Sequence, residues 1–406
     1  MSSSCPERPS RGSRVAVVLL AFGSPAAGAA DVYFQPRMDV TVDGNTNREL
    51  VSSGPEQASE GFYADFGGTL NYLTPDSTVI FRPKIGYEDY PQVDEKDLLV
   101  LTDLFSDYKT ERSDFLVTGQ FDRRSTYGSE LADATFNPVN PLQPTAPETG
   151  RINVNDTRTL GTLSPNFTYD LTKRLSWSVG GVLQDADYSG PGANGYVPFT
   201  YYVESTSLGW AATPKLDTKI TAFGSEESAK NGSGSVDGEG VTLGFDYKWS
   251  SQLSTHLEIL GERDDSNTRV PTTMSETSTS GGATVVTTWK GELSTLMFVA
   301  GRTFTPSGAG GKFALDQVHF EYHRDLAPRW KFTAAGIYDR FTPVTSAVGA
   351  SDYSYVNVEV TLKWLWTPTW FVATGAEYLF NKLGPPLGSA DNDMLYVQVG
   401  YEGLSR

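Results

Sequence analysis

Three histidines alternate with acidic residues, and these runs are the first whose spacing suggests chemistry. His256 precedes Glu258 by two positions, and His319, Glu321 and His323 alternate in the same way. Imidazole and carboxylate groups bind zinc, so a His-x-Glu-x-His run offers three ligands. On an extended strand, however, residues i and i+2 lie about 7 Å apart, which is too far for chelation without a neighbouring strand. We therefore predict no metal here and interpret the runs as polar faces of strands.

Other motifs of catalysis and binding are weak or missing. The sequence contains no Gly-x-Ser-x-Gly nucleophile motif, and its one cysteine is Cys5. Asp43–Asn47 resembles the start of a calcium loop but lacks the 12-residue pattern, so we interpret it as a turn. We predict a protein that is not an enzyme and has no cofactor. A barrel hydrolase with a serine in its lumen is the alternative from another class.

The first 30 residues have the layout of a secretion signal. Arg8, Arg11 and Arg14 precede the short apolar core Val15–Phe22, and small residues follow as far as Ala30. The apolar core is too short to cross a bilayer, which needs about 20 residues, so a membrane anchor is the weaker interpretation. We predict that residues 1–30 are cleaved and that residues 31–406 form a single domain.

The chain is acidic, with 32 basic and 49 acidic residues and a net charge of −17. Without residues 1–30, which hold three Arg and one Glu, 29 basic and 48 acidic residues leave a net charge of −19. This charge argues against nucleic acid as a partner. The mean hydropathy of −0.32 is compatible with a membrane barrel, in which only alternate residues contact lipid.

Alternation of apolar and polar residues recurs from Asp31 to Tyr401. In its clearest copy, Val241–Trp249, one face is wholly apolar and ends in an aromatic residue, while the other is polar and charged. Repetition of this pattern predicts an all-β protein, a transmembrane antiparallel up-and-down β-barrel with an aqueous lumen. A secreted antiparallel sandwich or a β-solenoid also alternates, but neither explains charged inner faces, since the inner face of a sandwich is the apolar one.

Eight short connections rich in turn-forming residues divide the pattern. They lie near residues 74–76, 109–111, 171–174, 213–215, 250–251, 291–292, 326–329 and 367–369. An aromatic residue precedes each connection, as in a membrane-interface belt. The predicted aromatic girdle consists of Tyr72, Tyr108, Tyr169, Trp210, Trp249, Trp289, Tyr322 and Trp366.

Longer connections separate the short ones. They are expected at Gly44–Ser59, Ser189–Pro198, Glu226–Asp237, Asp264–Ser280 and Leu383–Asn392. Eight short turns join 16 strands, and a strand at each end, Val32–Val42 and Asp393–Tyr401, brings the prediction to about 18. Short turns are periplasmic and long loops extracellular in outer-membrane barrels, so we predict both termini in the periplasm of a Gram-negative cell.

The polar faces supply the candidate residues for selectivity of a channel. Wide barrels carry charges that wet the lumen, and a minority of them set ion preference, here mildly for cations. The candidate lumen residues are Arg82, Lys84, Glu88, Asp246, Lys248, Glu258, Glu321, Glu359, Lys363 and Glu377. The longest connection, Ser125–Asp156, is expected either to fold into the lumen and narrow it or to lie in solvent.

Three segments resemble a known family. Phe34–Asn45, Thr110–Phe115 and Ser164–Trp177 are similar to strands of the outer-membrane barrels associated with PEP-CTERM/exopolysaccharide systems, the beta-barrel porin-2-like proteins. The resemblance implies a barrel of similar size and no catalytic residues. As partners of the predicted barrel we expect outer-membrane lipid and the barrel-assembly machinery, and the resemblance adds polysaccharide-export components. The predicted function is a porin-like channel or an export component, and the alternative is a structural or adhesin-like barrel with an occluded lumen.

Overall fold

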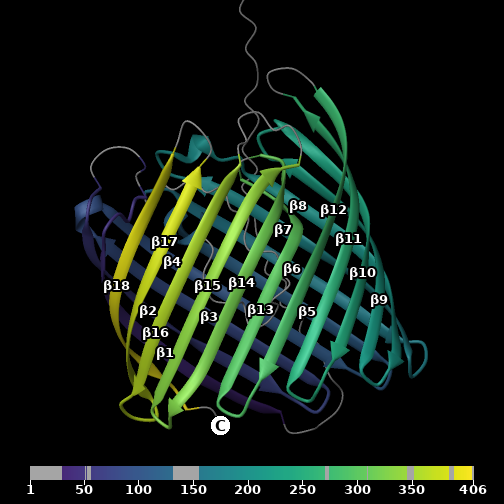
Figure 1. Cartoon of the computed structure of the whole chain (residues 1–406), viewed down its shortest axis with the longest axis horizontal. Coiled ribbons are helices and arrows are strands. Elements are labelled where there is room, and N and C mark those ends of the chain that lie inside the picture. The colour runs from purple at the N-terminus through teal and green to yellow at the C-terminus, as the bar shows by residue number, and fades with distance from the viewer. Residues whose placement is uncertain are drawn as a thin grey trace, which may run out of the picture.

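The structure is a computed structural model that describes residues 30–50, 52, 56–130, 155–269, 274–308, 310–344, 352–383 and 388–404. The expected signal segment therefore lies outside the described residues, except for Ala30. Most described residues belong to 18 strands of one sheet (Figure 1). The strands are β1 Asp31–Asn45, β2 Ser59–Leu73, β3 Ser77–Tyr90, β4 Glu95–Lys109, β5 Ser113–Ser125, β6 Thr157–Asp170, β7 Leu175–Ser189, β8 Phe199–Thr213, β9 Leu216–Ala229, β10 Gly234–Lys248, β11 Leu253–Thr268, β12 Met274–Lys290, β13 Ser294–Pro306, β14 Lys312–Ala327, β15 Trp330–Pro343, β16 Tyr353–Leu365, β17 Trp370–Leu383 and β18 Ser389–Glu402.

The sheet closes on itself. Every strand pairs antiparallel with its neighbours in sequence, and β1 also pairs with β18 from Arg37 opposite Glu402 to Asn45 opposite Met394. This confirms the predicted up-and-down barrel and its strand number. Three short helical turns lie between strands: η1 Pro91–Val93, α1 Thr126–Glu130 and η2 Ala193–Gly195. Within the described ranges, no helix is long and apolar enough to cross a membrane.

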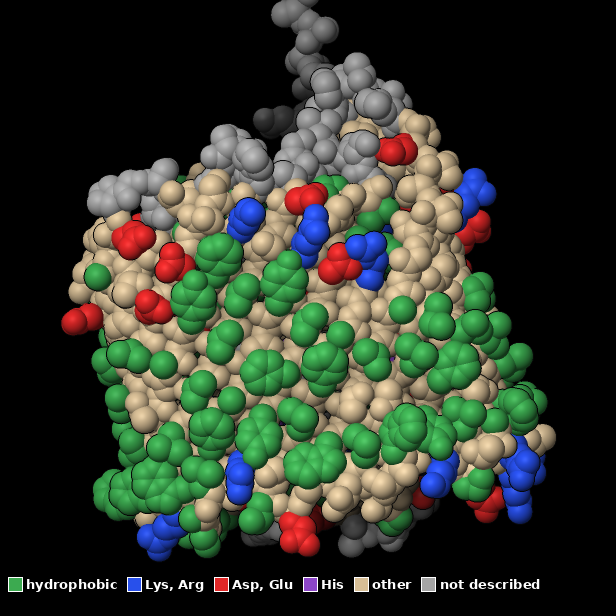
Figure 2. All heavy atoms as spheres, in the orientation of Figure 1, with side chains coloured by type: hydrophobic (Ala, Val, Ile, Leu, Met, Phe, Trp, Pro, Cys, Tyr) green, Lys and Arg blue, Asp and Glu red, His purple; other side chains and the backbone are tan. Residues whose placement is uncertain are grey.

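Alternation decides which side chains face outward. In β16, Val358 is 40% exposed on the outside, whereas its neighbour Asn357 is 3% exposed on the lumen side. In β18, Leu395, Val397 and Val399 are exposed in the same way. Hydrophobic side chains form a band across the visible wall, and charged ones gather above and below it (Figure 2). This exterior fits a bilayer, so the barrel spans a membrane.

The eight short connections occur where the sequence predicts them, between β2 and β3 and then between every second pair of strands as far as β16 and β17. Several share one device, a threonine hydroxyl that accepts a hydrogen bond from the amide that begins the next strand. The hydroxyls of Thr172 and Thr213 accept from Leu175 and Leu216 at 3.0 Å each. Such turns need no long loop, because the side chain replaces a backbone partner.

Some expected long loops consist mostly of strand, which corrects the prediction. The Glu226–Asp237 connection shrinks to residues 230–233, and Asp264–Ser280 to residues 269–273. Ser389 already belongs to β18, which shortens Leu383–Asn392 as well. These strands extend past the apolar band into water, where β11 and β12 project at the upper right of Figure 1. Their polar composition therefore reflects exposure to water, and it was wrongly interpreted as loop.

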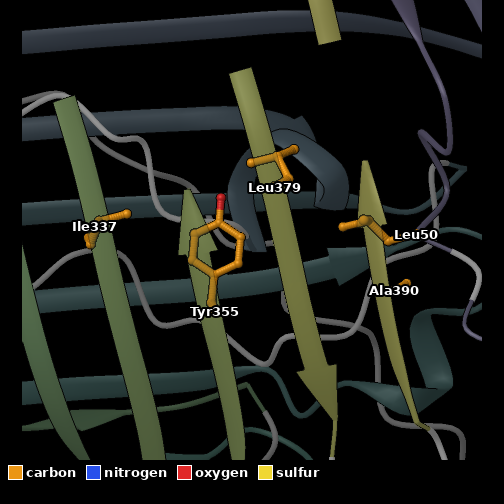
Figure 3. Packing of buried hydrophobic residues seen from close by; sticks show 5 residues of the cluster. All are labelled: Leu50, Ile337, Tyr355, Leu379 and Ala390. Carbon is orange, nitrogen blue, oxygen red and sulfur yellow. The ribbon is translucent and has the colours of Figure 1, made fainter. Parts of the chain in front are cut away.

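The lumen wall is not polar throughout. At the long-loop end, inward-facing Ile337, Tyr355, Leu379 and Ala390 form an apolar cluster with Leu50, which comes from the connection between β1 and β2 (Figure 3). Two further apolar clusters are centred on Phe313 and Phe199. These apolar positions depart from the polar and charged inner face expected from the sequence, because segments that fold inward cover these strand ends and keep them from water.

The facing of β16 predicts opposite effects at adjacent positions. Val358→Arg places a charge on the lipid side and should lower the free energy of unfolding by about 2–4 kcal/mol or prevent assembly. Folding yield in detergent and heat-modifiable gel migration would measure this effect.

Glu359→Gln is the matched control, because its side chain lies on the lumen side and keeps an oxygen for hydrogen bonds from Tyr396 and Thr361. It should fold like the parent. Equal behaviour of the two variants would contradict the facing.

Candidate functional site in the barrel lumen

The first loop, residues 46–50 after β1, folds into the barrel through a buried arginine. The guanidinium of Arg48 donates to Glu95 at 2.5 Å and to Glu88 at 3.1 Å, and all three side chains are less than 10% exposed. Arg48 also lies over the ring of Tyr90, 3.4 Å from the ring centroid, and 4.3 Å from that of Tyr127. Two carboxylates and two aromatic faces thus surround one cation, which is the environment that suits a desolvated guanidinium.

Electrostatics keep Arg48 charged. Burial, the largest single influence, lowers the pKa of its guanidinium, but Glu95, Tyr90, Tyr127 and Glu88 together outweigh it and raise that pKa above its ordinary value. Glu88 is held from a second side, because the hydroxyl of Ser125 donates to it at 3.1 Å. The charge is therefore permanent, and the first loop is fixed to the walls formed by β3 and β4.

A side-chain amide of β18, the strand that closes the barrel on β1, holds the same loop from the other side. Asn392 of β18 donates to the side chain of Asn45 at 3.0 Å and accepts from the backbone of Asn47 at 2.9 Å. Asp43, which the sequence assigns to an ordinary turn, lies in β1 and accepts from the Tyr90 hydroxyl at 2.6 Å. The segment that resembles a calcium loop is therefore the end of a strand that leads into the inward-folded loop.

The connection Ser125–Asp156 begins inside the barrel. Its first part is α1, whose Tyr127 lies against Arg48 and accepts a hydrogen bond from Asn392 at 3.3 Å. Burial raises the pKa of the Tyr127 hydroxyl above its ordinary value. Residues 131–154 of this connection lie outside the described residues, so the expected role of the whole connection in narrowing the lumen is still a prediction.

Charged residues of both signs line the wall formed by β1 to β4. Lys84 pairs with Asp65 at 2.6 Å, and Arg37 pairs with Asp39 at 3.2 Å. Arg82 faces the lumen next to Lys84, with Asp103 of β4 directly opposite it in the register. The predicted basic candidates on β3 are thus neighbours of carboxylates, as in an ion-pair ladder.

The wall formed by β14 to β18 is acidic. Glu321, Glu359 and Glu377 lie in one row across the strands, since Glu321 is opposite Ala335, Ala335 is opposite Glu359, and Glu359 is opposite Glu377. The next residue in the row is the neutral Met394.

Neutral groups position two of these carboxylates. Glu359 accepts from the Tyr396 hydroxyl at 2.7 Å, and Glu377 accepts from Asn357 at 2.8 Å. Like charges directly across two strands are unfavourable without a compensating cation. Lower on the same wall, Lys363 pairs with Glu402 at 2.8 Å and lies over the Phe371 ring.

The remaining lumen candidates lie nearer the short turns. Asp246 and His256 are opposite each other and 2.8 Å apart, and Lys248 lies 3.9 Å from Asp217. Glu258 lies two positions after His256 on β11 and faces the lumen as well. Asp246 also lines a hollow of about 250 Å³ at this end of the barrel.

Neither histidine run forms a metal site in the structure. His323 pairs with Glu321 at 2.7 Å, and His256 is engaged with Asp246. Among the residues that the structure describes, no group of three or more His, Cys, Asp and Glu side chains has the arrangement needed to hold a metal ion.

The predicted girdle residues lie at the short-turn ends of their strands or directly beyond them. Tyr169 and Tyr322 are half-buried; the others, Tyr72, Tyr108, Trp210, Trp249, Trp289 and Trp366, are exposed. The Trp249 indole donates to Thr255 at 3.1 Å, and Tyr322 packs edge-on against Phe332. Amphipathic rings at this level suit the boundary between hydrocarbon and headgroups.

The sequence analysis missed the residues that enter the lumen from loops and strand ends. Arg48 carried no signal, because strand alternation says nothing about loop residues. Glu95 did carry one, since it continues the inward-facing positions of β4. Lys312 lies at the start of β14 and contacts Glu262 and Asp264 of β11, a pairing that no local pattern indicates.

No protein-family model matches the chain, and no curated protein is similar to it in sequence. The resemblance to the exopolysaccharide-associated barrels is therefore still a prediction. The solved structures that it is similar to include OccK11 (OpdR) of Pseudomonas aeruginosa, with a TM-score of 0.44, 11% identity and coverage of 92% of this chain and 96% of that one. OccK7 (OpdD) of the same species gives a TM-score of 0.47, 9% identity and coverage of 92% and 98%.

A third structure is OccAB4 of Acinetobacter baumannii, with a TM-score of 0.42, 11% identity and coverage of 91% and 98%. Resemblances at this level add nothing to the site, whose interpretation depends on this chain's own residues.

Arg48→Ala should release the first loop. The variant leaves Glu95 and Glu88 buried without their cation, and breaking a buried pair in this way costs about 3–5 kcal/mol. Hydrogen exchange measured by mass spectrometry should become faster in residues 46–50 and unchanged in the lipid-facing part of β16.

Arg48→Lys is the matched control, since it keeps the charge but loses the planar fork that reaches both carboxylates. Its effect should be smaller. Unchanged exchange in Arg48→Ala would show that the ion pairs do not hold the loop.

Proposed function

We propose that the protein is an outer-membrane channel of a Gram-negative cell that lets small solutes pass by diffusion and favours cations. Its short turns and both termini then face the periplasm, and its long loops face the exterior. The observation that carries the proposal is the acidic row of Glu321, Glu359 and Glu377 on the lumen wall, behind an apolar exterior.

Two physical arguments support passage of cations. A lumen enclosed by protein has a lower effective dielectric constant than bulk water, so carboxylates on its wall act strongly on passing ions. In addition, Glu359 and Glu377 lie directly opposite each other, so their negative potentials add on the same part of the lumen wall. Lys84 and Arg37, on the wall formed by β1 to β4, are paired with carboxylates, which weakens their attraction for anions.

An occluded barrel that acts as a structural or adhesin-like protein is the second candidate function. The inward-folded first loop favours it, because Arg48 and Leu50 fill part of the long-loop end. In that case the lumen charges serve only to hydrate and brace the wall. Steady conductance in a bilayer distinguishes the two functions.

A more specific role in exopolysaccharide export rests on the family resemblance of Phe34–Asn45 and the two similar segments. It would add polysaccharide-export components as partners, besides outer-membrane lipid and the barrel-assembly machinery. Neighbouring genes for polysaccharide synthesis would support this role. Loss of exported polysaccharide on deletion, restored by the parent but not by a non-conducting variant, would link it to the channel.

Residues 31–406 in a planar bilayer under a KCl gradient should give a reversal potential on the cation-selective side. The double variant Glu359→Gln, Glu377→Gln should move this potential towards zero, because it removes adjacent charges from one row and keeps their shape. Glu204→Gln is the control, since Glu204 is exposed on the outer face of β8.

Absence of any conductance, together with barrel-like gel migration, would favour the occluded barrel. An equal shift in the double variant and in Glu204→Gln would show that the acidic row does not set selectivity.

A further inference from the structure

The wall of the barrel parts between β12 and β13 at the long-loop end. β12 begins at Met274, but its pairing with β13 starts only at Thr284, which is opposite Gly301. β13 nevertheless continues to Pro306, where it is still paired with β14 at Lys312. The end of the β13–β14 hairpin is therefore paired with β15, as far as Phe313 opposite Pro343, and has no strand pairing with β12.

This hairpin end lies inside the barrel. On the outward-facing side of β14, Val318 and Phe320 are 45% and 39% exposed, whereas Lys312 and Ala314 on the same side are 3% and 6% exposed. On β13, Phe304 is covered in the same way. The side that faces lipid lower down is thus covered by protein at the long-loop end.

The inner face of β11 provides this cover. The ammonium of Lys312 is bound by Glu262 and by Asp264, the latter at 3.0 Å. Both carboxylates lie on the face of β11 that carries His256 and Glu258, which is the lumen face. The hairpin end therefore lies on the lumen side of β11, inside the barrel, and does not form part of the wall at this level.

The tip of the hairpin, of which Ser307, Gly308, Gly310 and Gly311 are described, reaches further across the mouth. The amide of Val197, in the connection between β7 and β8, donates to the carbonyl of Gly308 at 2.7 Å. The amide of Gly311 donates to Glu227 of β9 at 3.2 Å. Glu227 belongs to β9 and the hairpin begins with β13, so three strands of the wall, β10, β11 and β12, separate them. The tip thus crosses the mouth in front of these three strands.

On the side away from β15, the tip is held by the ionic contacts of Lys312 and by the hydrogen bonds of Gly308 with Val197 and of Gly311 with Glu227. The side chains of Lys312, Glu262 and Asp264 are 4%, 2% and 0% exposed. Glu227, also buried, adds a third carboxylate beside this ammonium. The attraction within a buried ion pair offsets only part of the free energy that is lost when both charges leave water. An ionic contact therefore favours the closed position less than an apolar contact of similar size would. Gly310 and Gly311, both with φ of +89°, provide a turn that few other residues adopt.

We propose that the tip residues Ser307, Gly308, Gly310 and Gly311 form a latch across the mouth of the barrel, fastened by Lys312 to Glu262 and Asp264, and that its release widens the path to the lumen. The effect on solute passage rests on the proposed channel function, whereas the movement of the tip does not. In the fastened state the tip covers the sector in front of β10 to β12. In the released state the tip moves away from Val197 and Glu227, while Phe313 stays paired with Pro343 of β15.

A disulfide between positions 197 and 310 tests the latch directly. A Cβ atom at Gly310 would lie 3.9 Å from that of Val197, within the range of about 3.5–4.5 Å that disulfides use. The chain without residues 1–30 has no cysteine, so Val197→Cys with Gly310→Cys would contain the only two thiols. Gly310→Cys alone is the matched control, because it carries the same backbone strain.

The oxidised pair should form the disulfide in high yield and show a lower single-channel conductance than the same protein after reduction. The single variant should not respond to reductant. Failure to form the disulfide would place the tip elsewhere and overturn the proposal. Equal conductance before and after reduction of a fully formed disulfide would also overturn it.

Lys312→Met provides a second test without a cross-link, with Lys382→Met, exposed on β17 at the same end, as its control. Each is combined with Val197→Cys, and labelling by a maleimide is timed. Lys312→Met should label faster than the parent and Lys382→Met should not. Equal labelling of the three proteins would contradict the fastening role of Lys312. If no variant conducts, the channel function fails, while disulfide yield and labelling still decide whether the latch exists and moves.

Discussion

Inside a bilayer, a strand has no water to satisfy its backbone, and every donor and acceptor needs a partner within the protein. The pairing of β1 with β18 meets this demand, because it removes the two edges that an open sheet of 18 strands would leave. Closure then fixes the two faces of every strand. Val358 has to meet hydrocarbon and Glu359 has to face the lumen, since a slip of one residue would exchange them.

A ring of 18 strands is also too wide for wall side chains alone to fill. The two ends of the lumen are filled in different ways. Towards the short turns, paired charges such as Lys363 with Glu402 border the lumen and keep it hydrated. Towards the long loops, the chain folds segments of itself inward, and Arg48 and Lys312 fasten them to carboxylates on the wall. Polar side chains thus serve hydration in one half and attachment in the other.

Strand alternation and turn composition were sufficient to predict the fold from the sequence. The eight short turns, the strand number and the facing of residues such as Val358 and Glu359 depend on neighbours within one or two positions, which a sequence displays directly. Loop lengths were predicted less well, because Asp264 and its neighbours are polar in a strand that leaves the membrane. The contacts of Arg48 and Lys312 could not be predicted at all. Each of these residues contacts a segment that is distant in the sequence. Alternation predicts which face of a strand a residue lies on, but it does not predict which distant residue it contacts.

The seam between the first and last strands has a consequence for the order of assembly. Asn45 and Asn392, which are hydrogen-bonded across it, are 347 positions apart in the chain. Contacts of such sequence separation form late, because the entropy of the intervening chain is lost before they contribute. Until β18 arrives, β1 exposes an unpaired edge that can recruit any extended segment nearby. Shielding that edge during synthesis and insertion is therefore a requirement for this chain, and it ends only when the last strand pairs with the first.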